Sequence, residues 1–462
     1  MLNVPIHTPL LLPFFLSDYK NMSSQLQLLV LSNGHGEDII AGKVVQELLQ
    51  LEDSPQISIF PLVGEGHAYK KFDIEFIGAV QAMPSGGFVY MDSKQLVRDV
   101  KGGLVQLTLN QIKTMKQWVK AQNASGKKSA ILAVGDIVPL LFGFFSGVNY
   151  AFIGTAKSEY YVRDEVKLLK RNNKGAYWEN FSGSIYHPWE RWLMTRRRCK
   201  AVFPRDSLTT EILQKMGVRA FDTGNPMMDG LEPSFPTYRT YSIDAEHKEI
   251  IRPLVVTLLP GSRAPEAYAN WEQIMIGVSS LLEKMRATDV ATHTSRSLVL
   301  LGAITPSLDC NIFSNTLISQ GWRQISLEEL PFKFSDNKAL TFKQKNAYFV
   351  LTQNAYNDCL HMADMAIAMA GTATEQFIGL GKPAFTIPGK GPQFTKGFAE
   401  AQSRLLGDSV ILVEQAADIG KQVQHFFAYP DKLHVIAENG LRRMGRAGAA
   451  QRIAQCIVDK LG

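Results

Sequence analysis

The chain has 462 residues, enough for two to four domains at roughly 100–200 residues each. Hydrophobic residues make up 45% and charged residues 20%, so the chain can bury a sizeable core and is not disordered throughout. The net charge of +6 is a mild excess that does not indicate a dedicated nucleic-acid binder, and no apolar run reaches the roughly 18 residues of a spanning helix. A polytopic membrane protein is therefore excluded.

The first part of the chain alternates continuously apolar runs with longer amphipathic segments. Such runs are typical of strands buried on both faces of a parallel sheet, and the segments between them predict crossover helices. The predicted strands here are Leu26–Leu31, Ile57–Val63 and Ala130–Val134, and a helix is predicted over Leu104–Lys120.

The alternation starts again at Leu254, which predicts a second doubly wound α/β unit. Few apolar side chains occur around 231–252, and we place a boundary there. The predicted strands of the second block are Leu254–Leu259, Ser297–Leu301, Phe349–Thr352, Met365–Met369 and Ala384–Ile387, and the predicted helices are Trp271–Met285 and Asp358–Met362. The predicted organisation is a ragged N-terminal segment over 1–21, a first domain over 22–232, a linker over 233–252, a second domain over 253–435 and a C-terminal helix over 436–462.

The four cysteines form no C-x-x-C pair, and none has a histidine at the spacing of a zinc site. The sequence therefore predicts neither a disulfide framework nor a metal centre, which is typical of a reducing compartment such as the cytoplasm. We expect ordinary core thiols. These residues are Cys199, Cys310, Cys359 and Cys456.

Ligands of open parallel sheets bind beyond the carboxyl ends of the strands, so the loops after the strands are the candidate sites. One such loop opens a predicted helix and consists of Gly371, Thr372, Ala373 and Thr374. Free amides and the positive end of the helix dipole favour an anion there, and the hydroxyls can donate to phosphate. Glu375 follows, where it could cap the helix or accept hydrogen bonds from a ribose. An ordinary capped helix start explains the loop equally well.

A second strand-end loop presents an arginine on a small turn formed by Gly261, Ser262 and Arg263. A guanidinium binds phosphate through two parallel hydrogen bonds, so this loop is also a candidate phosphate site. The alternative is an ordinary surface arginine on a tight turn.

Two loops of the first block could supply a general base. Gly34 and Gly36 make the turn after the first strand permissive, and His35 between them belongs to the residue type that titrates near neutral pH. Asp136 follows a buried strand, where it could accept a proton from a sugar hydroxyl or cap the next helix. The sequence does not decide between His35 and Asp136.

Two segments suggest contact with a lipid surface. Val138–Val148 is unusually apolar, and Trp189 and Trp192 lie within a basic segment. A segment rich in tryptophan and arginine can lie at an interface with anionic headgroups. A core element and a solvated helix face are the alternatives, so a peripheral membrane contact stays open. The basic residues are Arg191, Arg196, Arg197, Arg198 and Lys200.

Several loops carry short motifs, and these motifs follow one another in a defined order and spacing over about half the chain. These motifs are Val202-Phe203-Pro204, Gly217-Val218, Thr223-Gly224-Asn225-Pro226, Leu259-Pro260-Gly261-Ser262-Arg263 with Glu266, and Ala370-Gly371-Thr372-Ala373-Thr374-Glu375 followed by Gly381-Lys382-Pro383. The set resembles lipid-A-disaccharide synthase, a glycosyltransferase of the two-domain GT-B fold. Pro388–Gln402 is also similar to the peptidoglycan lipid-intermediate transferase. The first-domain loops depart from the synthase pattern, and Asn225 stands where that family commonly has histidine.

The resemblance implies two Rossmann-like domains facing a central cleft, with a UDP-sugar donor held mainly by the second domain. It implies transfer of an N-acetylglucosamine-type sugar or a hexose, with inversion, to a lipid-linked or glycolipid acceptor on the cytoplasmic face of a membrane. Asp136 or His35 would be the catalytic base, and neither a metal nor a cofactor beyond the donor is expected. The implied substrate-binding residues are Gly34, Gly36, Asn225, Gly261, Ser262, Arg263, Gly371, Thr372, Ala373, Thr374, Glu375, Gln376 and Gln393.

Two other functions remain open. The same fold hosts UDP-N-acetylglucosamine 2-epimerases, which use soluble substrates, and it could also serve as a catalytically silent GT-B binding protein. The divergent first-domain loops leave room for the silent scaffold. A nucleic-acid partner is not expected, because the basic cluster is short. The sequence does not name the sugar, the acceptor or the oligomeric state.

Overall fold

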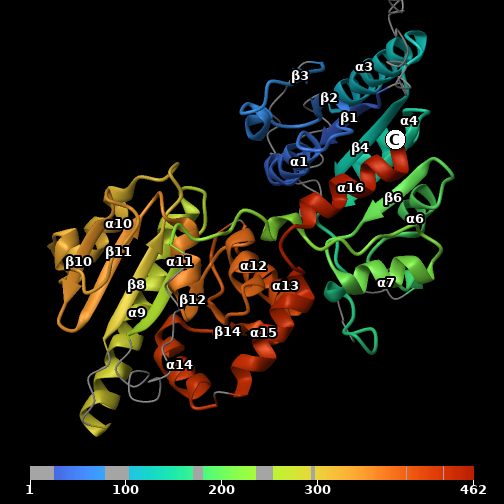
Figure 1. Cartoon of the computed structure of the whole chain (residues 1–462). Helices are drawn as coiled ribbons and strands as arrows, with labels where there is room; N and C mark the ends of the chain where they lie inside the picture. Colours follow the sequence, from blue (N-terminus) through green and yellow to red (C-terminus); the bar gives the residue numbers. More distant parts are fainter. Residues whose placement is uncertain are drawn as a thin grey trace, which may run out of the picture.

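The computed structural model describes residues 25–78, 104–169, 181–235, 253–292, 297–391, 393–429 and 431–462. The chain is built around two separate sheets that lie side by side (Figure 1). We call residues 25–235 the N half and residues 253–444 the C half. The predicted segment 1–21 and most of the predicted linker 233–252 lie outside the described residues.

The sheet of the N half has six parallel strands in the order β3-β2-β1-β4-β5-β6. The chain starts in the middle and winds outward in both directions, which is the doubly wound topology that the alternating pattern predicts. The elements are β1 Gln27–Ser32, α1 His35–Leu48, β2 Gln56–Pro61, β3 Glu75–Phe76, α3 Leu104–Ala124, β4 Ser129–Gly135, α4 Ile137–Phe145, β5 Asn149–Gly154, α6 Pro188–Met194, β6 Cys199–Phe203 and α7 Ser207–Lys215.

Both faces of this sheet are covered, which explains why β1 is apolar from Leu28 to Leu31. Leu28 and Val30 belong to one core cluster, with α1 and the C-terminal helix α16, Ala449–Leu461. Leu29 and Leu31 point to the other face and join a cluster with α3 and α4. Because side chains of a strand alternate between faces, a strand buried on both sides needs apolar residues at every position.

The sheet of the C half has eight strands in the order β14-β13-β12-β7-β8-β11-β10-β9. The strands from β14 to β11 are parallel, whereas β10 pairs antiparallel with β11 and β9, an extension that the sequence analysis did not predict. The elements are β7 Leu254–Leu259, α9 Glu266–Thr292, β8 Leu298–Ala303, α10 Cys310–Ser319, β9 Arg323–Ile325, β10 Leu340–Gln344, β11 Ala347–Thr352, α11 Tyr356–Met362, β12 Met365–Ala368, α12 Thr372–Gly379, β13 Ala384–Thr386, α13 Lys396–Leu406, β14 Val410–Leu412 and α14 Ile419–Phe427.

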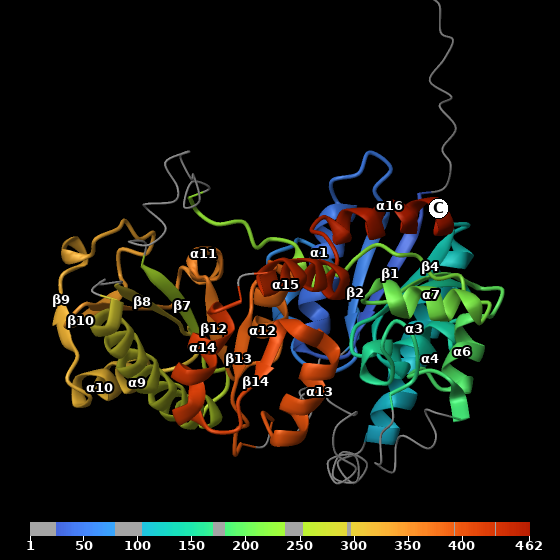
Figure 2. The same cartoon turned by 90° about the horizontal axis from the view of Figure 1, so that it is seen from below.

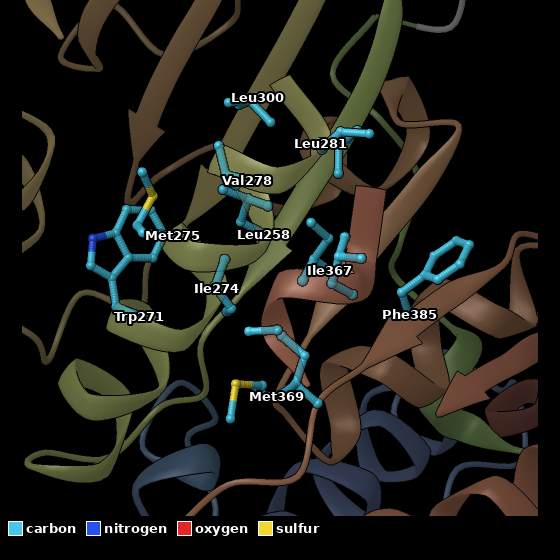
Figure 3. Packing of buried hydrophobic residues seen from close by; sticks show 14 of the residues in the cluster. Leu258, Trp271, Ile274, Met275, Val278, Leu281, Leu300, Ile367, Met369 and Phe385 are labelled. Carbon is cyan, nitrogen blue, oxygen red and sulfur yellow. The ribbon is translucent and has the colours of Figure 1, made fainter. Parts of the chain in front are cut away.

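Helix α9 packs on one face of this sheet (Figure 3). Its buried residues follow the spacing of one helix face, and they meet apolar side chains of β7, β8 and β12. The helix residues are Trp271, Ile274, Met275, Val278 and Leu281, and their strand partners include Leu258, Leu300 and Ile367.

The last two helices connect the halves. Helix α15, Asp431–Met444, packs against α12 in the C half, whereas α16 lies along the N half beside α1 (Figure 2). The carboxylate of Asp229 caps α16, because Oδ2 accepts from the amide of Ala450 at 2.7 Å and Oδ1 accepts from Ala449 at 3.1 Å. Within the described residues, no helix combines the length and apolarity needed to cross a membrane.

Candidate active site

Asp136 lies at the carboxyl end of β4 and joins two loops of the N half. Its Oδ1 accepts a hydrogen bond from the amide of Val138 at 2.9 Å, which caps α4, and another from Nδ2 of Asn33 at 2.7 Å. Gly135 makes this approach possible, because its φ is 138° and a Cβ there would lie 2.0 Å from Oδ1 of Asn33. Asp136 is therefore an N-cap and also faces the strand-end edge.

Two carboxyl groups at this edge hold protons more tightly than usual. Burial raises the pKa of Asp136, although the hydrogen bonds from Val138 and Asn33 counteract part of the effect. Burial also raises the pKa of Glu37, and the charge of Asp136 adds to it. Oγ1 of Thr155, after β5, donates to Oε1 of Glu37 at 3.3 Å. A carboxylate with a raised pKa is the better proton acceptor near neutral pH.

A buried ion pair lies beside these carboxyl groups. The ammonium of Lys157 contacts Oε2 of Glu190, and the side chains are only 5% and 3% exposed. Burial lowers the pKa of Lys157, and the charge of Glu190 opposes this shift. The sequence analysis missed both residues. Lys157 closely follows the apolar run that forms β5, so its place at a strand end was the available signal.

The other predicted residues of the N half lie at or near the same edge. Gly34 precedes α1, His35 is its first residue and is exposed, and Gly36 is exposed beside it. Asn225 is buried, and its side chain accepts from the amide of Met227 at 3.0 Å. The structure connects the loop of His35 to Asp136 through Asn33, and the choice between the two candidate bases stays a prediction.

The strand-end loops of the C half are tied to one another through their backbones. Nδ2 of Asn270, on α9, donates to the carbonyl of Pro260 at 3.0 Å and to that of Met369 at 3.3 Å. This side chain joins the loop after β7 to the loop after β12. Gly261 has a φ of 100°, in the left-handed region that favours glycine.

A third loop, after β13, is fixed in the same way. Oε1 of Glu266 accepts from the amide of Phe394 at 2.6 Å and from that of Gln393 at 3.1 Å. Nε2 of Gln402 donates to the carbonyl of Gly371 at 3.2 Å. Glu266 thus begins α9 and orders the neighbouring loop, as a carboxylate accepting backbone amides does well.

The predicted phosphate-binding residues differ in accessibility. Ser262, Arg263 and Thr372 are exposed, whereas Thr374 is fully buried and its hydroxyl donates to the carbonyl of Ala370 at 2.6 Å. The hydroxyl of Thr374 is therefore engaged within α12, and that of Thr372 remains exposed at the helix start. Ala373 is half-buried and the side chain of Gln393 is exposed.

Glu375 and Gln376 contact the N half. Nη2 of Arg205, which follows β6, donates to Oε2 of Glu375 at 2.8 Å. Nε2 of Gln376 donates to the carbonyl of Met227 at 2.8 Å, while its Oε1 accepts from the hydroxyl of Tyr356 at 2.7 Å. These two side chains, both among the predicted substrate-binding residues, thus connect the halves in this structure.

Other features of the described residues lie outside these edges. A cavity of about 320 Å³ is lined by residues of α14 and α15 and lies at the amino end of β14, the opposite edge of the sheet. The four cysteines are free thiols. Among the residues that the structure describes, no group of three or more His, Cys, Asp or Glu side chains could hold a metal ion.

Solved structures share this fold over almost the whole chain, although no protein-family model and no curated protein matches the sequence. MurG from Acinetobacter baumannii superposes with a TM-score of 0.54 at 13% identity, covering 94% of this chain and 99% of MurG. A protein described as a UDP-N-acetylglucosamine 2-epimerase from Listeria monocytogenes gives 0.52 at 12% identity, covering 93% and 95%. The calicheamicin glycosyltransferase CalG4 gives 0.51 at 13% identity, covering 96% and 99%.

At these identities the likeness shows the fold alone. These neighbours are GT-B enzymes with two Rossmann-like domains, and the two sheets of this chain have the same organisation. The prediction of an α/β chain with GT-B architecture is therefore confirmed. The activity of this chain has to be argued from the site itself.

Proposed function

We propose that this chain is a glycosyltransferase that moves a sugar from a UDP-sugar to a lipid-linked or glycolipid acceptor, similar in reaction to lipid-A-disaccharide synthase. One observation carries the proposal: the two sheets present complementary strand-end edges. The C half offers glycine loops, a helix start and Arg263, while the N half offers carboxyl groups with raised pKa values. Sugar transfer from UDP requires a site that stabilises the anionic leaving group and a side chain that accepts the proton of the acceptor hydroxyl.

The proposed reaction is a direct displacement at the anomeric carbon of the donor sugar. Asp136, or His35, removes the proton from the acceptor hydroxyl as the new C–O bond forms. The bond from the anomeric carbon to the UDP oxygen breaks, and the electron pair leaves with UDP. Arg263 and the start of α12 stabilise the charge that develops on the diphosphate. The configuration inverts, and the reaction needs neither a metal nor a cofactor beyond the donor.

A membrane contact is part of this proposal and rests on an aromatic–arginine surface at α4 and α6. We define this surface as Phe144, Phe145, Trp189, Trp192, Arg196 and Arg198. Phe145, Trp189 and Trp192 are 45%, 54% and 48% exposed. The guanidinium of Arg196 lies 4.2 Å from the ring of Trp192, and that of Arg198 lies 5.5 Å from the ring of Phe144.

Exposed rings beside guanidinium groups suit the boundary between lipid headgroups and acyl chains, with the charges favouring anionic lipids. Helix α4 also begins at its cap, Asp136. The surface is therefore one helix away from the proposed base, a fitting place for an acceptor whose lipid stays in the membrane.

Vesicle sedimentation tests the membrane contact. We expect binding to vesicles of phosphatidylglycerol and phosphatidylcholine, little binding to phosphatidylcholine alone, and at least a tenfold loss in Trp189→Ala/Trp192→Ala. Tyr429→Ala is the matched control, because Tyr429 is a 52% exposed aromatic residue of the C half. Equal binding of both variants would contradict the proposed surface.

Calorimetric titration with UDP tests the donor site. We expect micromolar-to-millimolar affinity and at least a tenfold loss in Arg263→Ala, which corresponds to about 1.4 kcal/mol. Arg323→Ala is the control, because Arg323 is exposed in the same half and we expect no change there. Absence of UDP binding by the intact protein would remove the donor site and favour a silent scaffold. Turnover of UDP-N-acetylglucosamine without any acceptor would instead indicate an epimerase.

A further inference from the structure

Arg205 and Glu375 form a buried ion pair between the two halves. Arg205 follows β6 of the N half, and Glu375 lies in the first turn of α12, 170 residues further along the chain. The side chains are 6% and 11% exposed. The guanidinium therefore reaches across the interface to the helix start at which the proposed donor diphosphate would bind.

Glu375 is an unfavourable neighbour for a diphosphate, because like charges a few ångströms apart destabilise each other. Arg205 is placed to cancel this charge. Burial opposes the charged form of Arg205, but Glu375, Tyr161 and Asp206 together outweigh burial, so the pKa of Arg205 is raised and the residue stays cationic. Its Nη1 also donates to the carbonyl of Thr155 at 3.4 Å, beside the edge that carries Glu37.

The other nearby carboxylate is already engaged. Oδ1 of Asp206 accepts from the amide of Thr209 at 2.8 Å and from its hydroxyl at 2.7 Å, which caps α7. Glu375 is thus the carboxylate to which Arg205 donates directly among the residues that the structure describes. Arg205 therefore forms its ion pair with α12, while the charge of Asp206 also favours its charged form.

We propose that Arg205 is a positioning residue of the donor site: it neutralises Glu375 and holds its carboxylate toward the N half, so that the start of α12 can accept a nucleoside diphosphate. This inference rests on the proposed function. It assigns Glu375 to an ion pair rather than to a ribose, and it gives the N half a part in donor recognition.

Titrations with UDP and with uridine separate a charge effect from a packing effect, because only UDP carries the diphosphate. In Arg205→Met the charge of Glu375 is uncompensated, so we expect UDP affinity to fall at least tenfold while uridine affinity changes less than twofold. In Glu375→Gln we expect UDP to bind as tightly as to the intact protein, or more tightly. The double variant Arg205→Met/Glu375→Gln should restore UDP affinity to within about threefold, and the loss in Arg205→Met should shrink with added salt.

Three results would overturn the inference. The first is an equal loss of UDP and uridine affinity in Arg205→Met, and the second is a double variant that stays as weak as that single variant. The third is an equal loss of both ligands in Glu375→Gln, which would make Glu375 a ribose ligand. If Arg205→Met does not fold, Glu375→Gln still gives the third result, and a double variant that binds UDP at least tenfold more weakly than the intact protein would also overturn the inference. Failure of the intact protein to bind UDP would contradict the proposed function itself.

Discussion

The strand-end edge of the N half carries carboxyl groups whose pKa values are raised by burial, whereas the corresponding edge of the C half carries glycines, backbone amides and hydroxyls beside the carboxylates of Glu266 and Glu375, which accept hydrogen bonds. At the first edge, Glu37 and Asp136 have raised pKa values, and Lys157 pairs with Glu190 in the interior. At the second, Asn270 fixes two loops through backbone carbonyls, and Glu266 fixes a third through backbone amides. One topology thus supports the two different edges that the proposed function requires, one to accept a proton and one to bind an anion.

The largest expected effect is the loss of transfer activity when the proton acceptor at the N-half edge is removed. Asp136→Asn keeps the cap of α4, because asparagine is also a good N-cap, but it removes the proton acceptor. We expect the transfer rate to an identified acceptor to fall roughly 10²–10⁴-fold with UDP affinity unchanged. His35→Ala is the companion variant. If it shows the large loss and Asp136→Asn does not, the base is His35.

The next largest expected effect is a loss of stability when one partner of the buried ion pair in the N half is removed. Lys157→Met leaves the carboxylate of Glu190 buried without its partner, so we expect a loss of roughly 3–5 kcal/mol in the free energy of unfolding, measured with urea. Lys157→Met/Glu190→Gln should recover most of this loss.

The control for this effect is Lys396→Met in the C half. Lys396 pairs with Glu414 at 2.9 Å, but the side chains are 71% and 61% exposed, so we expect a loss under about 1 kcal/mol. Comparable losses in Lys157→Met and Lys396→Met would show that the N-half edge does not depend on its buried charges.

The smallest expected effect is a pH dependence in the N half. Burial raises the pKa of Asp38 to about 6, although Oγ of Ser32 donates to its carboxylate at 2.6 Å. A raised pKa means that ionisation of Asp38 destabilises the fold above pH 6, and that this penalty disappears as the pH falls toward the ordinary value of 3.8.

Asp38→Asn removes this penalty. We expect it to stabilise the protein by roughly 1–2 kcal/mol at pH 7, with the gain vanishing near pH 4 in urea unfolding. A gain that is constant over this range would mean that Asp38 does not titrate as inferred.

The strand-end loops could be predicted from the sequence because their chemistry is local. An apolar run followed by Gly371 and Thr372, by Gly261 and Arg263, or by Asp136 marks a strand end without any knowledge of the fold. The fold class followed from the same alternation, and the GT-B pairing of two such units was implied by the resemblance to lipid-A-disaccharide synthase.

The partners of these residues could not be predicted, because they are set by tertiary packing. Asn33 meets Asp136 across 103 residues, and Arg205 meets Glu375 across 170. Neither pair has a spacing that a local pattern could reveal. The edge strand β9 and its neighbour β10 were missed for a related reason, since their side chains are not continuously apolar and carry little signal.

A crystal structure of the full chain with UDP tests the proposed donor site most directly. We expect the diphosphate against Arg263 and the first turn of α12, with Asp136 facing it across the interface and Glu375 still paired with Arg205. Diphosphate bound at the N-half edge beside Asn33 and Asp136, with the C-half loops empty, would show that the donor site is not in the C half.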